Sequence, residues 1–144
     1  MSESVQTIES VLNEKGFYIG VLSGKSMRPT LKERVDTIVV KAKTGRLSYL
    51  DVALFKRDGE YVLHRVVGVY EDGYLMRGDN CYADEWVDEK EVLGILMEFY
   101  HGEKRVSCSD KAYLRKVKTR LFFYPFRLSF VHVKAYVLRV FRKK

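Results

Sequence analysis

Short runs of β-forming residues, separated by turn-forming dipeptides, occupy most of this chain. The runs lie at 17–22, 36–41, 52–56, 61–70, 74–77, 91–100 and 105–108. Asp58-Gly59, Asp72-Gly73 and His101-Gly102 fall between consecutive runs, and Asp-Gly is a favoured hairpin connection. This pattern is typical of an antiparallel β barrel or sandwich.

Helical patterns are confined to the two ends of the chain. At 4–15 the apolar residues share one helical face: Val5, Ile8, Val11 and Leu12. Gly16 is a natural stop after them. Residues 111–144 contain no glycine, and we expect one or two helices there, broken near Pro125. The prediction is a mainly β domain at 1–110 with a short N-terminal helix, followed by a helical tail at 111–144.

Charge is divided unevenly at the same boundary. The 144 residues carry a net charge of +7, but residues 1–110 hold 15 basic and 19 acidic residues. Residues 111–144 hold 11 basic residues and no acidic ones. A mildly acidic body with a strongly basic tail predicts an anionic partner for the tail.

The cysteine content and the N-terminal sequence indicate where in the cell the protein is expected. Two cysteines, Cys81 and Cys108, cannot form a disulfide framework or a four-ligand zinc site. We therefore expect reduced thiols, with a single disulfide bridge as the alternative. We also expect no metal and no cofactor. Residues 2–14 carry acidic residues and no apolar run of the length that a signal peptide needs. These features predict a cytoplasmic protein that attaches peripherally to a membrane through its tail.

Three segments contain residue types suited to hydrolysis. They are 23–31 (Ser-Gly-Lys-Ser-Met-Arg-Pro-Thr-Leu), 61–66 (Tyr-Val-Leu-His-Arg-Val) and 78–80 (Gly-Asp-Asn). A serine hydroxyl becomes a good nucleophile when a nearby base accepts its proton. A histidine can do this at neutral pH, and a carboxylate behind it fixes its tautomer. Ser26, His64 and an acidic residue are therefore candidates for one catalytic relay.

Together these segments resemble the boxes of the signal peptidase I superfamily, whose fold is shared by LexA-like autoproteases. Residues 24–31 resemble the nucleophile box G-x-S-M-x-P-T-L, and 63–66 and 78–80 resemble the general-base box and the last box. Residues 51–55 resemble a further box, although Leu50 stands where that family usually has glycine. The boxes occur in family order within 17–108. The resemblance implies a serine endopeptidase with an antiparallel β fold.

The resemblance also implies roles for individual residues. Ser26 would be the nucleophile and His64 the base, as in the Ser/His type found in endoplasmic-reticulum and archaeal signal peptidases. Asp79 or Asp84 would orient the base, with Glu85 ranked behind them. Residues that would bind the oxyanion or the substrate are Ser23, Gly24 and Met27. We expect the pKa of His64 to lie near its free value of about 6.5, in a more solvated site than a lysine base would need.

The expected partner of this site is an extended peptide or preprotein, bound by strand addition with small residues near the cut. Because 1–14 does not resemble a membrane anchor, the leader of a small modified peptide is a possible substrate besides a secretory signal peptide. A non-catalytic peptide-binding or membrane-adaptor module with the same fold is the alternative. Self-cleavage is a third hypothesis, against which the histidine base and the lack of DNA-binding helices weigh.

The tail admits three interpretations. Its aromatic residues and interleaved cations suit an anionic membrane surface. The same residues suit a helix packed on the β domain or on a second subunit. Basic and aromatic side chains also stack on single-stranded nucleic acid, which is disfavoured here because the body is acidic. The sequence predicts no oligomeric state.

Overall fold

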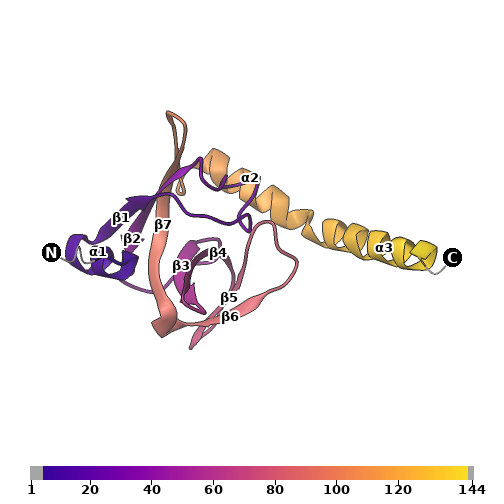
Figure 1. The fold of residues 1–144 in the computed structure, drawn as a ribbon, viewed down its shortest axis with the longest axis horizontal. Helices are drawn as coiled ribbons and strands as arrows, with labels where there is room; N and C mark the ends of the chain where they lie inside the picture. Colours follow the sequence, from indigo (N-terminus) through magenta and orange to yellow (C-terminus); the bar gives the residue numbers. More distant parts are fainter. Residues whose placement is uncertain (1–4, 143–144) are drawn as a thin grey trace. The chain divides into compact units, whose positions relative to one another are not determined.

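The computed structural model describes residues 5–142, and the chain divides between Ser109 and Asp110 into two compact units (Figure 1). The elements of the first unit are α1 (Ile8–Lys15), β1 (Phe17–Gly20), β2 (Thr37–Ala42), β3 (Val52–Arg57), β4 (Glu60–Val69), β5 (Gly73–Arg77), β6 (Glu85–Asp88), the 3₁₀ turn η1 (Glu89–Glu91), β7 (Val92–His101) and β8 (Lys104–Ser107). The second unit contains α2 (Lys111–Phe122) and α3 (Tyr124–Arg142).

The N-terminal helix has a defined cap at each end. The Thr7 side chain accepts a hydrogen bond from the Ser10 N–H at 3.1 Å, so α1 begins at Ile8 rather than at residue 4. Residue 4 lies outside the described residues. Gly16 adopts a left-handed φ of 78° and donates its N–H to the Leu12 carbonyl at 2.9 Å. This is the C-terminal glycine cap that the sequence predicts.

All strand pairs are antiparallel, in the order β1-β2-β7-β3-β4-β5-β6, with β8 paired to β7. The predicted antiparallel β architecture with helices at both ends is confirmed. The described strands form an open sheet rather than a closed barrel, because β1 and β6 end the order. Strand β6 and η1 were not predicted, since Glu85–Glu91 is rich in acidic residues that are uncommon in strands.

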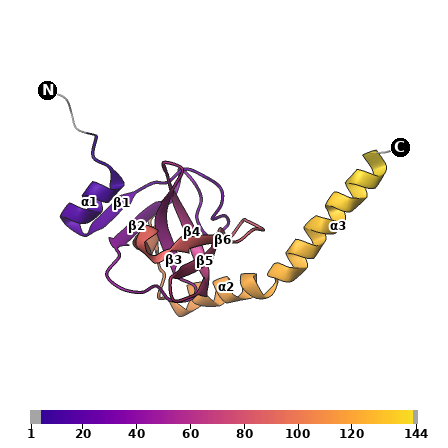
Figure 2. The ribbon, with the colours of Figure 1, turned by 90° about the horizontal axis from the view of Figure 1, so that it is seen from below.

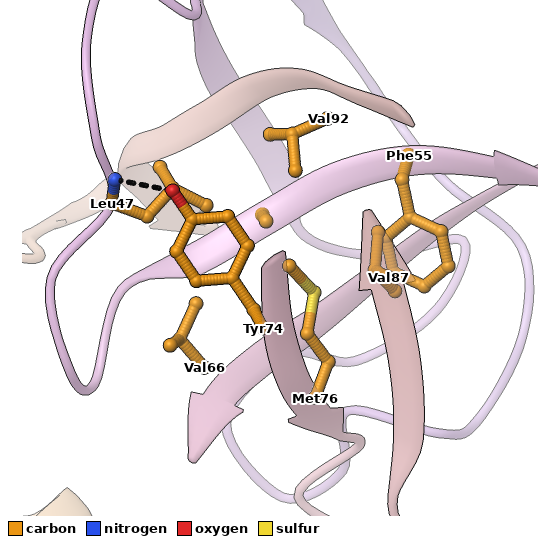
Figure 3. Packing of buried hydrophobic residues seen from close by; sticks show 8 residues of the cluster. Leu47, Phe55, Val66, Tyr74, Met76, Val87 and Val92 are labelled. Atoms are coloured by element: carbon orange, nitrogen blue, oxygen red, sulfur yellow. Dashed lines mark hydrogen bonds between the residues drawn. The ribbon is translucent and has the colours of Figure 1, made fainter. Parts of the chain in front are cut away.

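The main core lies between β3, β4, β5, β6 and β7 (Figure 3). Its buried residues are Leu47, Ala53, Phe55, Val66, Tyr74, Met76, Val87 and Val92. The Tyr74 ring is fully buried, and its hydroxyl accepts a hydrogen bond from the Leu47 N–H at 3.0 Å. This polar link ties the 43–51 connection to β5 while the aliphatic residues fill the space around the ring.

The basic tail is two helices, shown consecutively in Figure 2. The break falls at Phe123, two residues before Pro125, as the sequence predicts. Proline has no N–H to donate to the carbonyl one turn earlier, so α2 cannot continue through it. Within residues 5–142, no helix combines the length and the apolar character that crossing a membrane requires.

Candidate active site

A cleft of about 520 Å³ opens in the first unit. Its walls come from the loop after β1 (Leu22–Asp36), from Glu60–His64 at the start of β4, and from Cys81–Glu85. All the candidate residues except Asp79 line it: Ser23, Gly24, Ser26, Met27, His64 and Asp84. Glu85 lines it as well. The fold therefore brings together segments that are far apart in the sequence.

The Gly78-Asp79-Asn80 turn holds the loop that carries Ser26. The Asn80 N–H donates to the Ser26 carbonyl at 2.8 Å, and the Asn80 side-chain amide donates to the Lys25 carbonyl at 3.2 Å. The Thr30 hydroxyl donates to the Asp79 carboxylate. Two of the three sequence motifs are thus joined by hydrogen bonds, which fix the backbone on both sides of Ser26.

Gly78 packs closely against both the Ser26 backbone and the His64 ring. A Cβ atom at this glycine would lie 2.5 Å from the Ser26 carbonyl oxygen, 2.8 Å from Cys81 Sγ and 3.0 Å from His64 Nε2. The Ser26 carbonyl and Nε2 of His64 therefore both approach Gly78. Glycine is required here by close packing and not by a positive φ.

His64 is held on β4 opposite Ala53 of β3. Its side chain is only 7% exposed, and its ring packs edge-on against Phe55 with the centroids 5.9 Å apart. Burial lowers the pKa of His64 below its ordinary value of 6.5, while the Glu85 carboxylate acts in the opposite direction. The expectation of a solvated histidine with an unshifted pKa is wrong, because the β3–β4 pair places the ring inside the sheet's packed face.

Glu85 is the acidic residue next to the histidine ring. Its Oε1 lies 2.6 Å from His64 Nδ1, although the ring N–H is not well aligned with the oxygen. Its Oε2 lies 2.5 Å from Arg57 Nη1, at the end of β3. The carboxylate is therefore positioned between an arginine and the imidazole. Since Nδ1 faces Glu85, Nε2 is the nitrogen on the side of Gly78 and Ser26.

The two aspartates favoured from the sequence have other partners. Asp79 forms a two-pronged ion pair with Arg65, with N–O distances of 2.7 and 2.8 Å. Asp84 pairs with Arg77 at 3.0 Å, and its side chain is 39% exposed. The structure thus places Glu85, which the sequence ranked third, where Asp79 or Asp84 was expected. The sequence ranked the acidic residues by their place in the Gly-Asp-Asn motif. In the structure, the position at which β6 begins determines which carboxylate reaches the His64 ring.

Arg65 is a structural residue of this site that the sequence reasoning missed. It is fully buried, and besides Asp79 its guanidinium donates to the Leu50 carbonyl at 2.8 Å. Leu50 has a left-handed φ of 79°, a conformation that favours glycine. The Arg65 hydrogen bond and the burial of the Leu50 side chain help to hold the strained residue in place.

The residues expected to bind substrate or oxyanion differ in exposure. Ser23 and Gly24 are exposed in the cleft, whereas Met27 is 4% exposed and belongs to the core. A Cβ at Gly24 would contact nothing within 4 Å, but its φ of 107° requires glycine. Gly24 therefore sets the course of the backbone before Ser26.

Cys81 also reaches the cleft and is a free thiol. Burial raises the pKa of this thiol, so it is protonated at neutral pH and is a poor nucleophile. The Cys81 sulfur packs beside Gly78, 2.8 Å from where a Cβ on that glycine would lie. Within residues 5–142, no three histidine, cysteine or acidic side chains gather in an arrangement that would bind a metal ion.

Comparisons with protein-family models and with curated protein sequences gave no match to this chain.

Proposed function

We propose that the chain is a serine endopeptidase resembling signal peptidases, which cuts an extended signal or leader peptide. The observation that carries the proposal is the convergence of Ser26, His64 and Glu85 in one cleft. A turn serine, a strand histidine and a carboxylate at the start of a strand are each common alone. Their place in one cleft, with the Ser26 backbone and His64 Nε2 both near Gly78 and a carboxylate behind the histidine, suits nucleophilic acyl transfer.

The proposed chemistry depends on how the His64 ring is oriented, with Nδ1 facing Glu85 and Nε2 on the side of Gly78. Nε2 of His64 takes the proton of the Ser26 hydroxyl as the oxygen attacks the scissile carbonyl carbon. Glu85 stabilises the imidazolium, which then gives its proton to the leaving amine as the peptide bond breaks. A water molecule, deprotonated by the same nitrogen, hydrolyses the acyl-serine ester and releases the new carboxyl end. Backbone amides near Gly24 and Ser26 would hold the oxyanion.

The start of β4 supports an extended peptide as substrate. Residues Glu60–Arg65 pair with β3 on one side, but β5 pairs with β4 only from Arg65 onward. The other edge of Glu60–His64 therefore borders the cleft without a paired strand among residues 5–142. A peptide that adds to this edge gains main-chain hydrogen bonds that depend little on its sequence, and its scissile bond comes close to His64.

A peptide-library digestion tests this function. We expect wild-type protein to cut a subset of peptides and Ser26→Ala to cut none, with unchanged circular dichroism and thermal midpoint. Ser23→Ala is the matched control, because Ser23 lies in the same loop and lines the same cleft; it should retain most of the activity. Equal cleavage by wild-type and Ser26→Ala would overturn the proposal. Peptide binding without cleavage by the wild-type chain would favour the non-catalytic peptide-binding module instead.

A further inference from the structure

Helix α3 presents a continuous apolar face to solvent. Phe126, Phe130, Val133, Val137 and Val140 recur at alternating spacings of four and three residues, which places them on one side of a helix. Their exposed fractions are 66, 70, 60, 42 and 43%. No residue of α3 is buried. Such a long exposed apolar face on a described helix is typical of an interaction surface.

The charged residues of α3 are all basic. Lys134, Arg139 and Arg142 are exposed. At 3.6 residues per turn, Arg139 and Arg142 fall on the side away from the apolar face, and Lys134 flanks the face. Arg127 flanks the same edge of the face, with its guanidinium 5.9 Å from the centre of the Tyr124 ring. Residues 111–144 contain no acidic residue. The side away from the apolar face also carries Leu128, Val131 and Leu138, but every charge on the helix is positive.

The exposed apolar face and the exclusively positive charge of α3 distinguish among the partners that could bind this helix. The four-three spacing also suits a coiled-coil seam, but a second copy would bring only cations alongside it, without the opposite charges that stabilise such pairs. Nucleic acid would use the cations and leave the aliphatic residues Val133, Val137 and Val140 exposed. An acidic lipid surface accommodates both the apolar face and the cations that flank and oppose it.

We infer that α3 binds in the plane of a bilayer containing acidic lipids. The apolar face lies at the boundary between headgroups and acyl chains, where aromatic rings such as Phe126 and Phe130 are well accommodated. The lysine and arginine side chains extend along the surface to reach lipid phosphates and carboxylates. This inference is independent of the proposed peptidase activity, since it uses no residue of the cleft.

Vesicle co-sedimentation of the full chain tests the inference. The probes are vesicles of phosphatidylcholine alone and vesicles containing 30% phosphatidylserine (about one acidic lipid in three), at low and high salt. The charge variant is Lys134→Gln/Arg139→Gln/Arg142→Gln, and its matched control, with the same change in net charge, is Lys15→Gln/Lys90→Gln/Lys104→Gln in the first unit. The apolar variant is Phe126→Ser/Phe130→Ser, with Val35→Ser/Tyr49→Ser as control; the control residues are 61 and 57% exposed.

We expect salt-sensitive binding to the acidic vesicles only. The charge variant should bind roughly a hundred-fold more weakly, at about five-fold per charge, and the apolar variant should also lose binding, while both controls bind as wild type. Equal binding to both kinds of vesicle, or none to either, would overturn the inference. So would a lipid-free dimer that Phe126→Ser/Phe130→Ser dissociates, or tight binding to an oligonucleotide in place of vesicles. Circular dichroism of each variant checks that α3 is intact.

Discussion

Nδ1 of His64 lies 2.6 Å from Oε1 of Glu85, and the same carboxylate is held from behind by Arg57. This relationship assigns separate roles to three neighbouring acidic residues. Glu85 contacts the imidazole, Asp79 joins the serine loop to a buried arginine, and Asp84 forms a partly exposed ion pair with Arg77. The assignments lead to distinct consequences for each residue.

Glu85→Gln should lower the kcat of the proposed peptidase by about 10²–10⁴, because a neutral amide stabilises the imidazolium poorly and can favour the wrong tautomer. Asp84→Asn is the control, since a surface ion pair contributes only about 0–1 kcal/mol to stability; its kcat should stay within a few-fold of wild type. Steady-state kinetics on one cleaved peptide measures both. A larger loss in Asp84→Asn than in Glu85→Gln would contradict the assignment.

The pH dependence should reflect the buried histidine. Because burial lowers the pKa of His64, kcat/KM should rise with pH to a plateau, with a midpoint below 6.5. Glu85 raises this pKa, so Glu85→Gln should move the midpoint lower still. NMR titration of the His64 ring gives the pKa independently of activity. A midpoint above 6.5 in both measurements would show that the ring is not desolvated as described.

The same shift has a consequence for stability. Between the lowered pKa of folded His64 and about 6.5, the unfolded chain binds more protons than the native one. The contribution of His64 therefore makes the free energy of unfolding rise with pH across that window. Comparing urea unfolding of wild type and His64→Gln at several pH values isolates this contribution. A difference between the two proteins that does not change across the window would contradict it.

Asp79→Asn should destabilise the fold as well as impair activity. It removes the charge that pairs with the fully buried guanidinium of Arg65, and breaking a buried ion pair costs about 3–5 kcal/mol. It also weakens the link from Thr30 to β4. Chemical denaturation measures the loss, and Asp84→Asn is the control for an exposed pair. A loss below 1 kcal/mol in Asp79→Asn would show that this ion pair does not anchor the serine loop.

Gly78→Ala should separate Ser26 from His64. The new Cβ would lie 2.5 Å from the Ser26 carbonyl oxygen, so the loop must move, and a displacement of about 1 Å can cost 10²-fold in rate. Gly45→Ala is the matched control, since its Cβ would meet nothing within 4 Å. Peptide cleavage and thermal unfolding of both variants give the comparison. Near wild-type activity in Gly78→Ala would mean that the close approach at Gly78 is not needed.

Local sequence signals were sufficient to predict most of the fold. Residue periodicity located the main strands, and the turn at Asp58-Gly59 has the left-handed φ values, 50 and 81°, that the dipeptide predicts. Asp72-Gly73 does lie where β4 connects to β5, as predicted, but the glycine is needed there for close packing and not for a left-handed φ. Gly73 already belongs to β5, and its Cβ would lie 2.5 Å from the Val87 carbonyl oxygen of β6. Such close packing depends on strand pairing and is not visible in a local pattern.

The sequence named most of the candidate residues that line the cleft, but not the contacts between them. Ser26 and His64 follow from motifs, but the choice of Glu85 over Asp79 and Asp84 depends on where β6 begins and on the course of the Cys81–Asp84 loop. Arg65 and Thr30 lie inside the quoted motifs, yet only the fold shows that Asp79 joins them. The strained Leu50 likewise becomes intelligible once the Arg65 hydrogen bond to its carbonyl is known.

The most direct test of the central claim is the intact mass of the full chain after reaction with a fluorophosphonate probe, followed by peptide mapping. An activated serine displaces fluoride and forms a stable phosphonyl ester. The account predicts one adduct per chain at Ser26, none in Ser26→Ala, a greatly slowed reaction in His64→Ala, and normal labelling in Ser23→Ala. No adduct in the folded wild-type chain, or an adduct at another serine that persists in Ser26→Ala, would contradict it.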